Sequence, residues 1–191
     1  MVSWLVLPSS PIGSNRRIEL AGLDLLILPR IDNVFVYPAE LDIDRFKDVL
    51  SDTLSLWPLV AGRFLVLDGG HYFIEMSDNG IPVTYAENIE LEKWPLNDNI
   101  VVDIVQNPFL PFIDGVQTTE LMKSSNEEPL LRLKLTHIVQ SGEFILGTSW
   151  AHVLGDAASN LNFLHTLSRL YQQLEPAKPL PIFERRLWRE E

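Results

Sequence analysis

The stretch from Phe144 to Ala151 is apolar on both faces, unlike the alternating pattern of a strand with one face in water. Such a run predicts a strand in the interior of a β-sheet, with packed layers on both sides of it. Asp156 then begins a segment of helical periodicity, which we expect to end in the region Pro176–Pro181. The stripe that this helix should bury consists of Phe163, Leu164, Leu167, Leu170, Tyr171 and Leu174. A covered strand followed at once by a long helix favours a layered α/β arrangement.

A second helix is predicted in the first third of the chain. Apolar residues recur at three- and four-residue spacing after Leu41–Asp44 and as far as Pro58, whose ring cannot continue a helix. The acidic pair Asp42/Asp44 lies at the start of this helix, where capping and the helix dipole explain it. A short strand is expected just before the helix, at Val34–Tyr37.

A β-meander is predicted after this helix. Strands at Arg63–Leu67 and His71–Met76 are joined by Asp68-Gly69-Gly70, a strong hairpin signal because glycine reaches positive φ freely. We expect the meander to continue into a third strand at Pro82–Tyr85. From Glu87 to Phe112 the sequence is rich in acidic residues and proline, which predicts irregular surface structure with one short helix.

The second half of the chain has a sharper pattern. Leucines alternate with polar residues from Leu131 to Thr136, which predicts a half-buried strand, and the turn Gln140–Glu143 leads from it into the covered strand. No internal repeat or linker divides the chain. The sequence therefore predicts one α/β domain over residues 1–191, built from a mixed β-sheet with covering helices.

The composition restricts the expected partners. Hydrophobic residues make up 46% of the chain and charged residues 21%, as in folded globular proteins. The formal net charge of -11 repels nucleic acid and anionic membrane surfaces, so neither is expected as a partner. The apolar patch Trp4–Leu7 is far shorter than the roughly 20 residues that a membrane span requires. Without cysteine there is no disulfide and no thiolate zinc site, and we expect a cytoplasmic protein.

His152 follows the covered strand directly and precedes Asp156 by four residues. A histidine at the end of a covered strand is partly desolvated, which favours the neutral imidazole that can accept a proton. Gly155 permits a tight strand-to-helix turn, and Asp156 can cap the helix with its carboxylate. The pattern predicts a general base, His152, held in a fixed and concave place. The alternative for the same residues is a histidine of the core followed by an ordinary helix cap.

The remaining histidines and two serines are weaker candidates. His71 starts a hairpin strand and should be an exposed edge residue, and His137 falls in phase with buried leucines. His165 lies on the last helix with no acidic partner four residues away. Ser55 and Ser149 lack the strand-turn-helix context of a nucleophilic serine. No phosphate-binding glycine loop or metal-ligand cluster stands out, so no metal is expected.

Several blocks of the sequence resemble the BAHD family of CoA-dependent acyltransferases, in the order and spacing of that family. Leu20–Asp24 is similar to the opening segment of the family, and Thr53–Arg63 resembles the segment that begins with Thr-Leu-Ser and ends with Ala-Gly-Arg. Pro129–Thr136, Ser141-Gly142 and His152–Asp156 resemble the strand, the turn and the His-x-x-x-Asp motif. The resemblance runs from about residue 20 to residue 175 and covers the first half of a family member.

This resemblance implies one of two similar α/β domains with a solvent channel between them. Residues 1–191 would be the N-terminal, histidine-bearing domain, ending near the crossover linker, with the second domain absent from this chain. His152 would deprotonate a hydroxyl or amine of a small molecule of secondary metabolism, which attacks an acyl-CoA thioester. Asp156 would orient the loop through a salt bridge to an arginine. Acyl-CoA is then a co-substrate, no permanently bound cofactor is implied, and a second domain or another chain is needed for activity.

The sequence departs from the family at a few positions and leaves other functions open. Ala157 and Ser141 stand where the family usually has glycine, and Ala151 stands where condensation domains of peptide synthetases usually have another histidine. One alternative is a half-size acetyltransferase with its site between identical subunits, similar to chloramphenicol acetyltransferases. Another is a non-catalytic binding or interaction domain that kept the fold. The scattered pairs Arg16-Arg17 and Arg185-Arg186 form no obvious cluster for the phosphates of CoA, so the sequence does not identify the CoA-binding residues.

Overall fold

The structure is a computed structural model that describes residues 1–11, 16–20, 22–25, 29–38, 40–94, 109–116 and 126–183. Its main sheet has the strand order β1-β6-β7-β8-β3. The strands are β1 (Val2–Val6), β3 (Arg30–Tyr37), β6 (Ile81–Asn88), β7 (Leu131–Ile138) and β8 (Phe144–Ala151). Strands β6 and β7 run parallel, and the other neighbours are antiparallel. The mixed sheet with covering helices confirms the predicted fold class.

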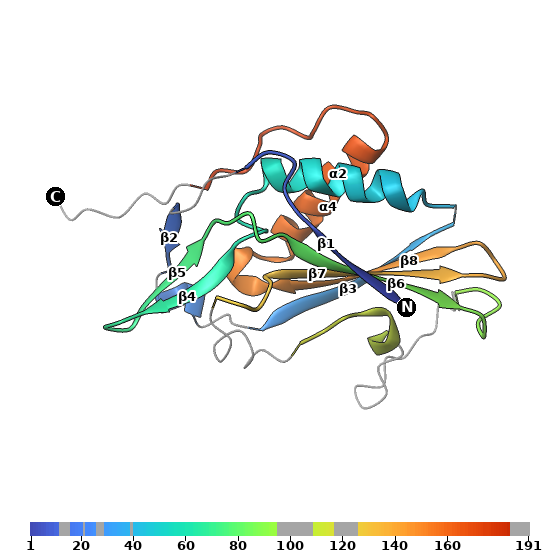
Figure 1. Ribbon diagram of the computed structural model, residues 1–191, viewed down its shortest axis with the longest axis horizontal. Helices are drawn as coiled ribbons and strands as arrows, with labels where there is room; N and C mark the ends of the chain where they lie inside the picture. Colours follow the sequence, from blue (N-terminus) through green and yellow to red (C-terminus); the bar gives the residue numbers. More distant parts are fainter. Residues whose placement is uncertain are drawn as a thin grey trace.

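A smaller sheet with the order β2-β5-β4 lies beside the main sheet (Figure 1). Its strands are β2 (Arg17–Glu19), β4 (Arg63–Leu67) and β5 (His71–Glu75). Gly69 and Gly70, in the turn between β4 and β5, have φ of +88° and +78°. Because other residues rarely adopt such angles, these glycines allow the tight turn, and the predicted hairpin is confirmed.

Two long helices cover one face of the main sheet, α2 (Ile43–Leu56) and α4 (Ala157–Tyr171) (Figure 1). Asp42 caps α2, since its carboxylate accepts hydrogen bonds from the backbone N–H groups of Asp44 and Arg45. The helix ends just before Pro58, as its sequence predicts. The shorter helices are α1 (Gly22–Leu25) and the 3-10 turns η1 (Leu110–Phe112) and η2 (His152–Leu154). No helix of the described residues has the length and apolar character needed to span a membrane.

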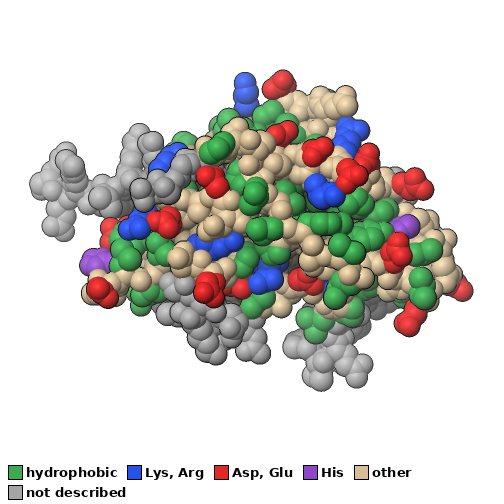
Figure 2. Space-filling model, in the orientation of Figure 1, with side chains coloured by type: hydrophobic (Ala, Val, Ile, Leu, Met, Phe, Trp, Pro, Cys, Tyr) green, Lys and Arg blue, Asp and Glu red, His purple; other side chains and the backbone are tan. Residues whose placement is uncertain are grey.

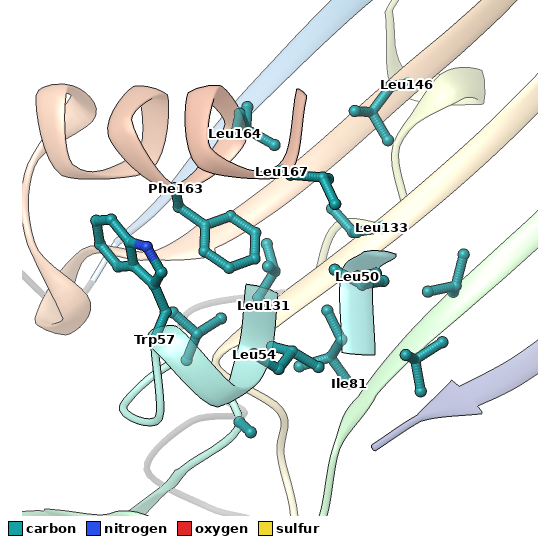
Figure 3. Close-up of a cluster of buried hydrophobic side chains, with 14 of the residues drawn as sticks. Leu50, Leu54, Trp57, Ile81, Leu131, Leu133, Leu146, Phe163, Leu164 and Leu167 are labelled. Carbon is teal, nitrogen blue, oxygen red and sulfur yellow. The ribbon is translucent and has the colours of Figure 1, made fainter. Parts of the chain in front are cut away.

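The main core lies between the two helices and the sheet (Figure 3). Leu50 and Leu54 of α2 and Phe163 of α4 are fully buried. They meet Leu131 and Leu133, which lie on the inner face of β7 and are also fully buried. Burial of each such side chain contributes about 1.5–3 kcal/mol, so this cluster fixes α4 against the sheet.

The opposite face of β8 is covered by a second layer. Trp94, Phe112, Ile138 and Ile145 form a buried cluster there, with η1 lying beneath β7 and β8 in Figure 1. Gly147 is needed at this contact, because a side chain on it would overlap the carbonyl oxygen of Phe112. All eight residues of β8 are buried, which confirms the prediction of a strand covered on both faces.

Two expectations about the elements were wrong. The strand expected to begin at Val34 already begins at Arg30, because the four residues Arg30–Asn33, three of them polar, also pair with β8. The meander does not continue: β6 pairs with β1 and β7 instead of with β5, and it runs on to Asn88. Burial explains this pairing, since Ile81 and Val83 are fully buried in the main core. Residues 95–108 of the region expected to be irregular lie outside the described residues.

The last helix is shorter than its sequence pattern suggests. It ends at Tyr171, ahead of Pro176–Pro181, and Gln173 has a φ of +60° that no helix accommodates. Leu174, expected in the buried stripe, therefore lies beyond the helix and is 46% exposed. The chain then runs back over the helices towards the smaller sheet (Figure 1).

Candidate active site

The site is built on the connection between β8 and α4. The 3-10 turn η2 begins at His152, directly after the last residue of β8. The backbone N–H of His152 donates to the carbonyl oxygen of Pro29 at 3.1 Å, and that of Gly155 donates to the carbonyl oxygen of His152 at 3.0 Å. The indole N–H of Trp150 donates to the carbonyl oxygen of Gly155 at 3.0 Å. These bonds fix the main chain on both sides of the histidine.

Gly155 makes the turn into the helix possible. Its φ of +138° and ψ of 177° lie in a region that glycine occupies almost alone. A Cβ atom at this position would lie 2.5 Å from the hydroxyl of Ser159 and 2.7 Å from its Cβ. The prediction that this glycine permits a tight strand-to-helix turn is confirmed.

Asp156 is the N-cap of α4, as predicted. Its carboxylate accepts hydrogen bonds from the backbone N–H of Ser159 at 2.9 Å and from the hydroxyl of Ser159 at 3.0 Å. These bonds hold the pKa of the exposed Asp156 below its ordinary value, and the bond from the backbone N–H has the larger effect. Within the described residues the Asp156 carboxylate forms no ion pair with an arginine.

His152 lines a cavity of about 820 Å³. The ring is half-buried and forms no hydrogen bond or ion pair with any residue in the part of the chain that the structure describes. The smaller sheet contributes Ile18 and Ile74 to the walls, and α4 contributes Asn162. The segment 177–183 closes another side of the cavity. The His152 imidazole thus lies in a concave, largely apolar space, and no described neighbour bonds to its nitrogens.

The charges around this cavity are few. Asp24 and Asp156 line it, and Lys178 is the sole Lys or Arg among its described lining residues. Of the two arginine pairs noted in the sequence, Arg17 of the first forms an ion pair with Glu75 at 2.8 Å. The second pair, Arg185-Arg186, lies outside the described residues. On the face drawn in Figure 2, basic side chains are scattered among acidic ones and do not form one patch. The described wall therefore offers little to the phosphates of a nucleotide.

The other candidate residues lie away from this cavity. His71 is exposed, as predicted, and contacts Glu19, but β5 is the middle strand of its sheet and not an edge. His137 is half-buried and stacks on the ring of Phe144 at 4.6 Å, and His165 is exposed on α4. Within the described residues no group of three or more acidic or histidine side chains could hold a metal ion.

The two serines considered as nucleophiles both have other roles. Ser55, on α2, shares hydrogen bonds with the hydroxyl of Ser9 and the backbone N–H of Ser10. Ser149 is fully buried in β8, where its hydroxyl accepts a hydrogen bond from Arg30. Neither serine lines the cavity that holds His152.

Sequence reasoning missed two buried arginines. Arg63 ends the segment that resembles the Ala-Gly-Arg motif, and it donates to the carbonyl oxygens of Ala61, Gly62 and Gly80. It therefore holds β4 against neighbouring turns. Arg30, at the start of β3, is buried next to the end of β8. A charged residue at a strand end suggests exposure, and only the pairing of β3 with β8 reveals that Arg30 is covered.

A family model described as Transferase family matches residues 1–191, the full length of this chain. The chain belongs to the Transferase family. Relatives named as acyltransferases are among the proteins to which it is similar, and the resemblance of its motifs to the BAHD acyltransferases is confirmed.

Among its relatives in the Transferase family, Protein ECERIFERUM 2 of Arabidopsis thaliana is 30% identical, over 92% of this chain and 43% of the relative. Acetyl-CoA-benzylalcohol acetyltransferase of Clarkia breweri is 24% identical, over 86% of this chain and 37% of the relative. The crystal structure of vinorine synthase shares the fold, with a TM-score of 0.70 and 21% identity over 96% of this chain and 45% of that one. The chain thus spans less than half the length of these three proteins.

Proposed function

We propose that this chain forms the histidine-bearing wall of an acyltransferase, which moves an acyl group from a CoA thioester to a hydroxyl or amine of a small molecule. The observation that carries the proposal is the position of His152. Its ring lies half-buried in a cavity of about 820 Å³, at the end of a strand that is buried along its whole length. Membership of the Transferase family supports acyl transfer as the reaction class.

In this proposal His152 is the general base. An unprotonated ring nitrogen accepts the proton of the acceptor O–H or N–H while the acceptor oxygen or nitrogen attacks the thioester carbonyl carbon. The resulting tetrahedral oxyanion collapses, the carbon–sulfur bond breaks, and the CoA thiolate takes up the proton from the imidazolium. Transfer of the acyl group thus leaves the histidine unchanged at the end of each turnover.

Asp156 and Gly155 have an orienting role in the proposal. Asp156 holds the first turn of α4, and Gly155 lets the chain reverse between that turn and β8. His152 is fixed between these two anchored ends. Neither residue needs to touch the substrate, which fits the exposed position of Asp156 and its bonds to Ser159.

The cavity favours a small, largely apolar acceptor. Ile18, Leu20 and Trp57 contribute apolar surface, and Asn162 adds an amide that can orient a polar group. One relative carries acetyl-CoA and benzyl alcohol in its name, and a benzyl alcohol is an acceptor of this kind. We therefore propose an alcohol as the first acceptor class to test, and an amine as the second.

The remainder of the CoA-binding surface is proposed to come from outside residues 1–191. A CoA molecule carries several phosphate charges, and the described lining of the cavity supplies Lys178 against Asp24 and Asp156. A second acyltransferase domain, or another chain, would supply the missing cations. The length of the relatives supports this, since the chain covers 43% and 37% of the two named above.

The test is an acyl-transfer assay on the longest natural polypeptide that contains this chain. Acetyl-CoA and malonyl-CoA are supplied with panels of small alcohols and amines, and the release of the free CoA thiol is followed beside the acylated product. Acylation of at least one acceptor class, with one thiol released for each product, is the expected result. Thiol release without an acylated product, or no release with any pair, would reject the proposal.

A further inference from the structure

The Arg30 side chain, 3% exposed, lies beside the end of β8 that leads to His152. Its Nε donates to the hydroxyl of Ser149 at 2.8 Å, and its Nη2 donates to the carbonyl oxygen of Ser149 at 2.6 Å. Nη1 and Nη2 also donate to the carbonyl oxygens of Pro129 at 3.1 Å and Leu130 at 3.2 Å. One guanidinium group thus ties β3 to β8 and to the segment that enters β7.

The same contacts hold the main chain next to the histidine. Arg30 is the register partner of Ala151, the last residue of β8. The backbone N–H of Ala151 donates to the carbonyl oxygen of Leu130 at 2.8 Å, an oxygen that Arg30 also contacts. The backbone N–H of His152 donates to the carbonyl oxygen of Pro29, the residue before Arg30. Arg30 therefore contacts the acceptor of the Ala151 amide directly, and it follows the acceptor of the His152 amide in the chain.

The charge of Arg30 is balanced by the carboxylate of Glu128, whose side chain is 10% exposed. Burial lowers the pKa of Arg30 to about 10, so the group is still charged at neutral pH. The Glu128 carboxylate lies 3.7 Å from Nη1 of Arg30. It also accepts two hydrogen bonds of 2.8 Å from the guanidinium of Arg132, one to each oxygen. Lysine could not replace this arrangement, because it lacks the planar fork of five donors that arginine presents.

We infer that Arg30 is a positioning residue for His152, which fixes the main chain of Ala151 and His152 so that the imidazole keeps one place in the cavity. The inference rests on the proposed role of His152 as general base. A base has to lie within hydrogen-bond reach of the proton it removes, and a misplacement of about 1 Å can lower the rate by about a hundredfold. Arg30 acts through the strand end and touches no substrate.

The test compares Arg30→Lys with the matched variant Arg63→Lys in the full polypeptide. Arg63 is also buried and donates to three carbonyl oxygens, but none of them belongs to β3 or β8. Arg30→Lys should speed hydrogen exchange of the Ala151 and His152 amides by at least about tenfold, because their local opening becomes easier. Arg63→Lys should leave the exchange of these two amides within about twofold of the parent protein.

Steady-state kinetics supply a second readout, at a temperature where circular dichroism shows both variants folded. Arg30→Lys should lower kcat by at least about tenfold while the KM for acyl-CoA stays within about twofold, since the base is displaced and the donor site is not. Arg63→Lys should change neither constant by more than about twofold. Should Arg30→Lys fail to fold, Ser149→Ala removes one acceptor of Arg30 and should shift both readouts in the same direction by less.

Equal effects of the two arginine variants on the Ala151 and His152 amides would overturn the inference, because they would show general loss of stability. Unchanged exchange at both amides in the folded Arg30 variant would overturn it as well. The exchange result does not depend on turnover. A parent protein without acyl transfer would therefore reject the proposed function, while the amides would still decide whether Arg30 fixes the end of β8.

Discussion

His152 and Asp156 are four residues apart in the sequence but have different surroundings. The His152 ring is half-buried in the cavity, and no described residue bonds to it. The Asp156 carboxylate is exposed and bound to the backbone N–H and the hydroxyl of Ser159. The His152 ring is therefore accessible to a molecule bound in the cavity, whereas the Asp156 carboxylate is bound to the end of the helix. The two residues should therefore differ in their effects on rate and on stability.

Replacement of His152 tests whether this residue contributes to the rate of acyl transfer. Under the proposed function, His152→Ala in the longest natural polypeptide that contains this chain should lower kcat by at least about a hundredfold, the scale of general-base catalysis. The melting temperature should hardly change, because the ring forms no hydrogen bond with described residues. His165→Ala is the control: His165 is exposed on α4, and its loss should leave kcat intact. Near-normal acyl transfer by the His152 variant would show that another group is the base.

Replacement of Asp156 tests stability. Asp156→Ala removes the N-cap of α4 and should lower the melting temperature by a few degrees, with a smaller effect on kcat than the loss of His152 has. Asp156→Asn should lower the melting temperature much less, because asparagine is also a good N-cap. Thermal unfolding followed by circular dichroism measures both. Identical melting temperatures in all three proteins would contradict the structural role.

The same carboxylate should make stability depend on pH. Hydrogen bonds from Ser159 hold the pKa of Asp156 below its ordinary value of 3.8. A group whose pKa is lowered by folding stabilises the protein above its ordinary pKa, and this contribution disappears as the pH falls through the folded value. The gap in melting temperature between the parent and Asp156→Ala should thus be constant at neutral pH and shrink below pH 3.8. A gap that widens in acid would contradict this sign.

At the scale of the elements, β8 and the start of α4 could be predicted well from the sequence. Burial on both faces of β8 leaves a run without alternation, and the capping of α4 requires a residue such as Asp156 at its start. These signals are local, so one chain displays them without its partners. The same holds for the Gly69-Gly70 turn, where the backbone angles demand glycine.

Long-range pairing could not be predicted in this way. The parallel neighbour of β6 is β7, whose first residue follows the last of β6 by more than forty positions, and nothing local in either strand marks the other. The burial of Arg30 depends on Ser149 and on the segment before β7, which meet only in the folded sheet. The cavity likewise requires residues 177–183 to return to the smaller sheet. Contacts between distant segments thus account for what the sequence pattern missed.

The turn between β8 and α4 permits a test at this scale. Gly155→Ala places a Cβ 2.5 Å from the Ser159 hydroxyl in a backbone region that other residues avoid, which should cost about 1–3 kcal/mol. Either the turn or the first turn of α4 has to shift, so kcat should fall together with the melting temperature. Gly142→Ala is the matched control, because Gly142 also has a positive φ but no atom lies within 4 Å of its added Cβ. That variant should keep full acyl transfer, and a similar loss of rate in both would contradict the argument.

At the scale of the whole molecule, the cavity has an apolar rim and few cations. Leu180 and Ile182, from the segment that closes one side, are 43% and 85% exposed. The chain as a whole carries a formal net charge of -11, which opposes the approach of an anionic donor such as acyl-CoA. Lys178 is the single cation among the described lining residues. Exposed apolar side chains beside a site with one cation among its described lining residues suit a surface that a further domain or chain would complete.

This arrangement predicts how the 191 residues behave when they are produced alone. They should bind acetyl-CoA and malonyl-CoA at least about tenfold more weakly than the complete polypeptide, a loss of at least about 1.4 kcal/mol of binding free energy. They should also show no turnover. Titration calorimetry with both donors measures the affinity, and light scattering on the same samples measures whether the apolar rim drives association. If the chain alone is a monomer that binds CoA and transfers acyl groups, the second surface is not needed, and these residues are a self-sufficient half-size enzyme. If it associates into a defined oligomer and becomes active on doing so, another copy of the chain supplies the second surface.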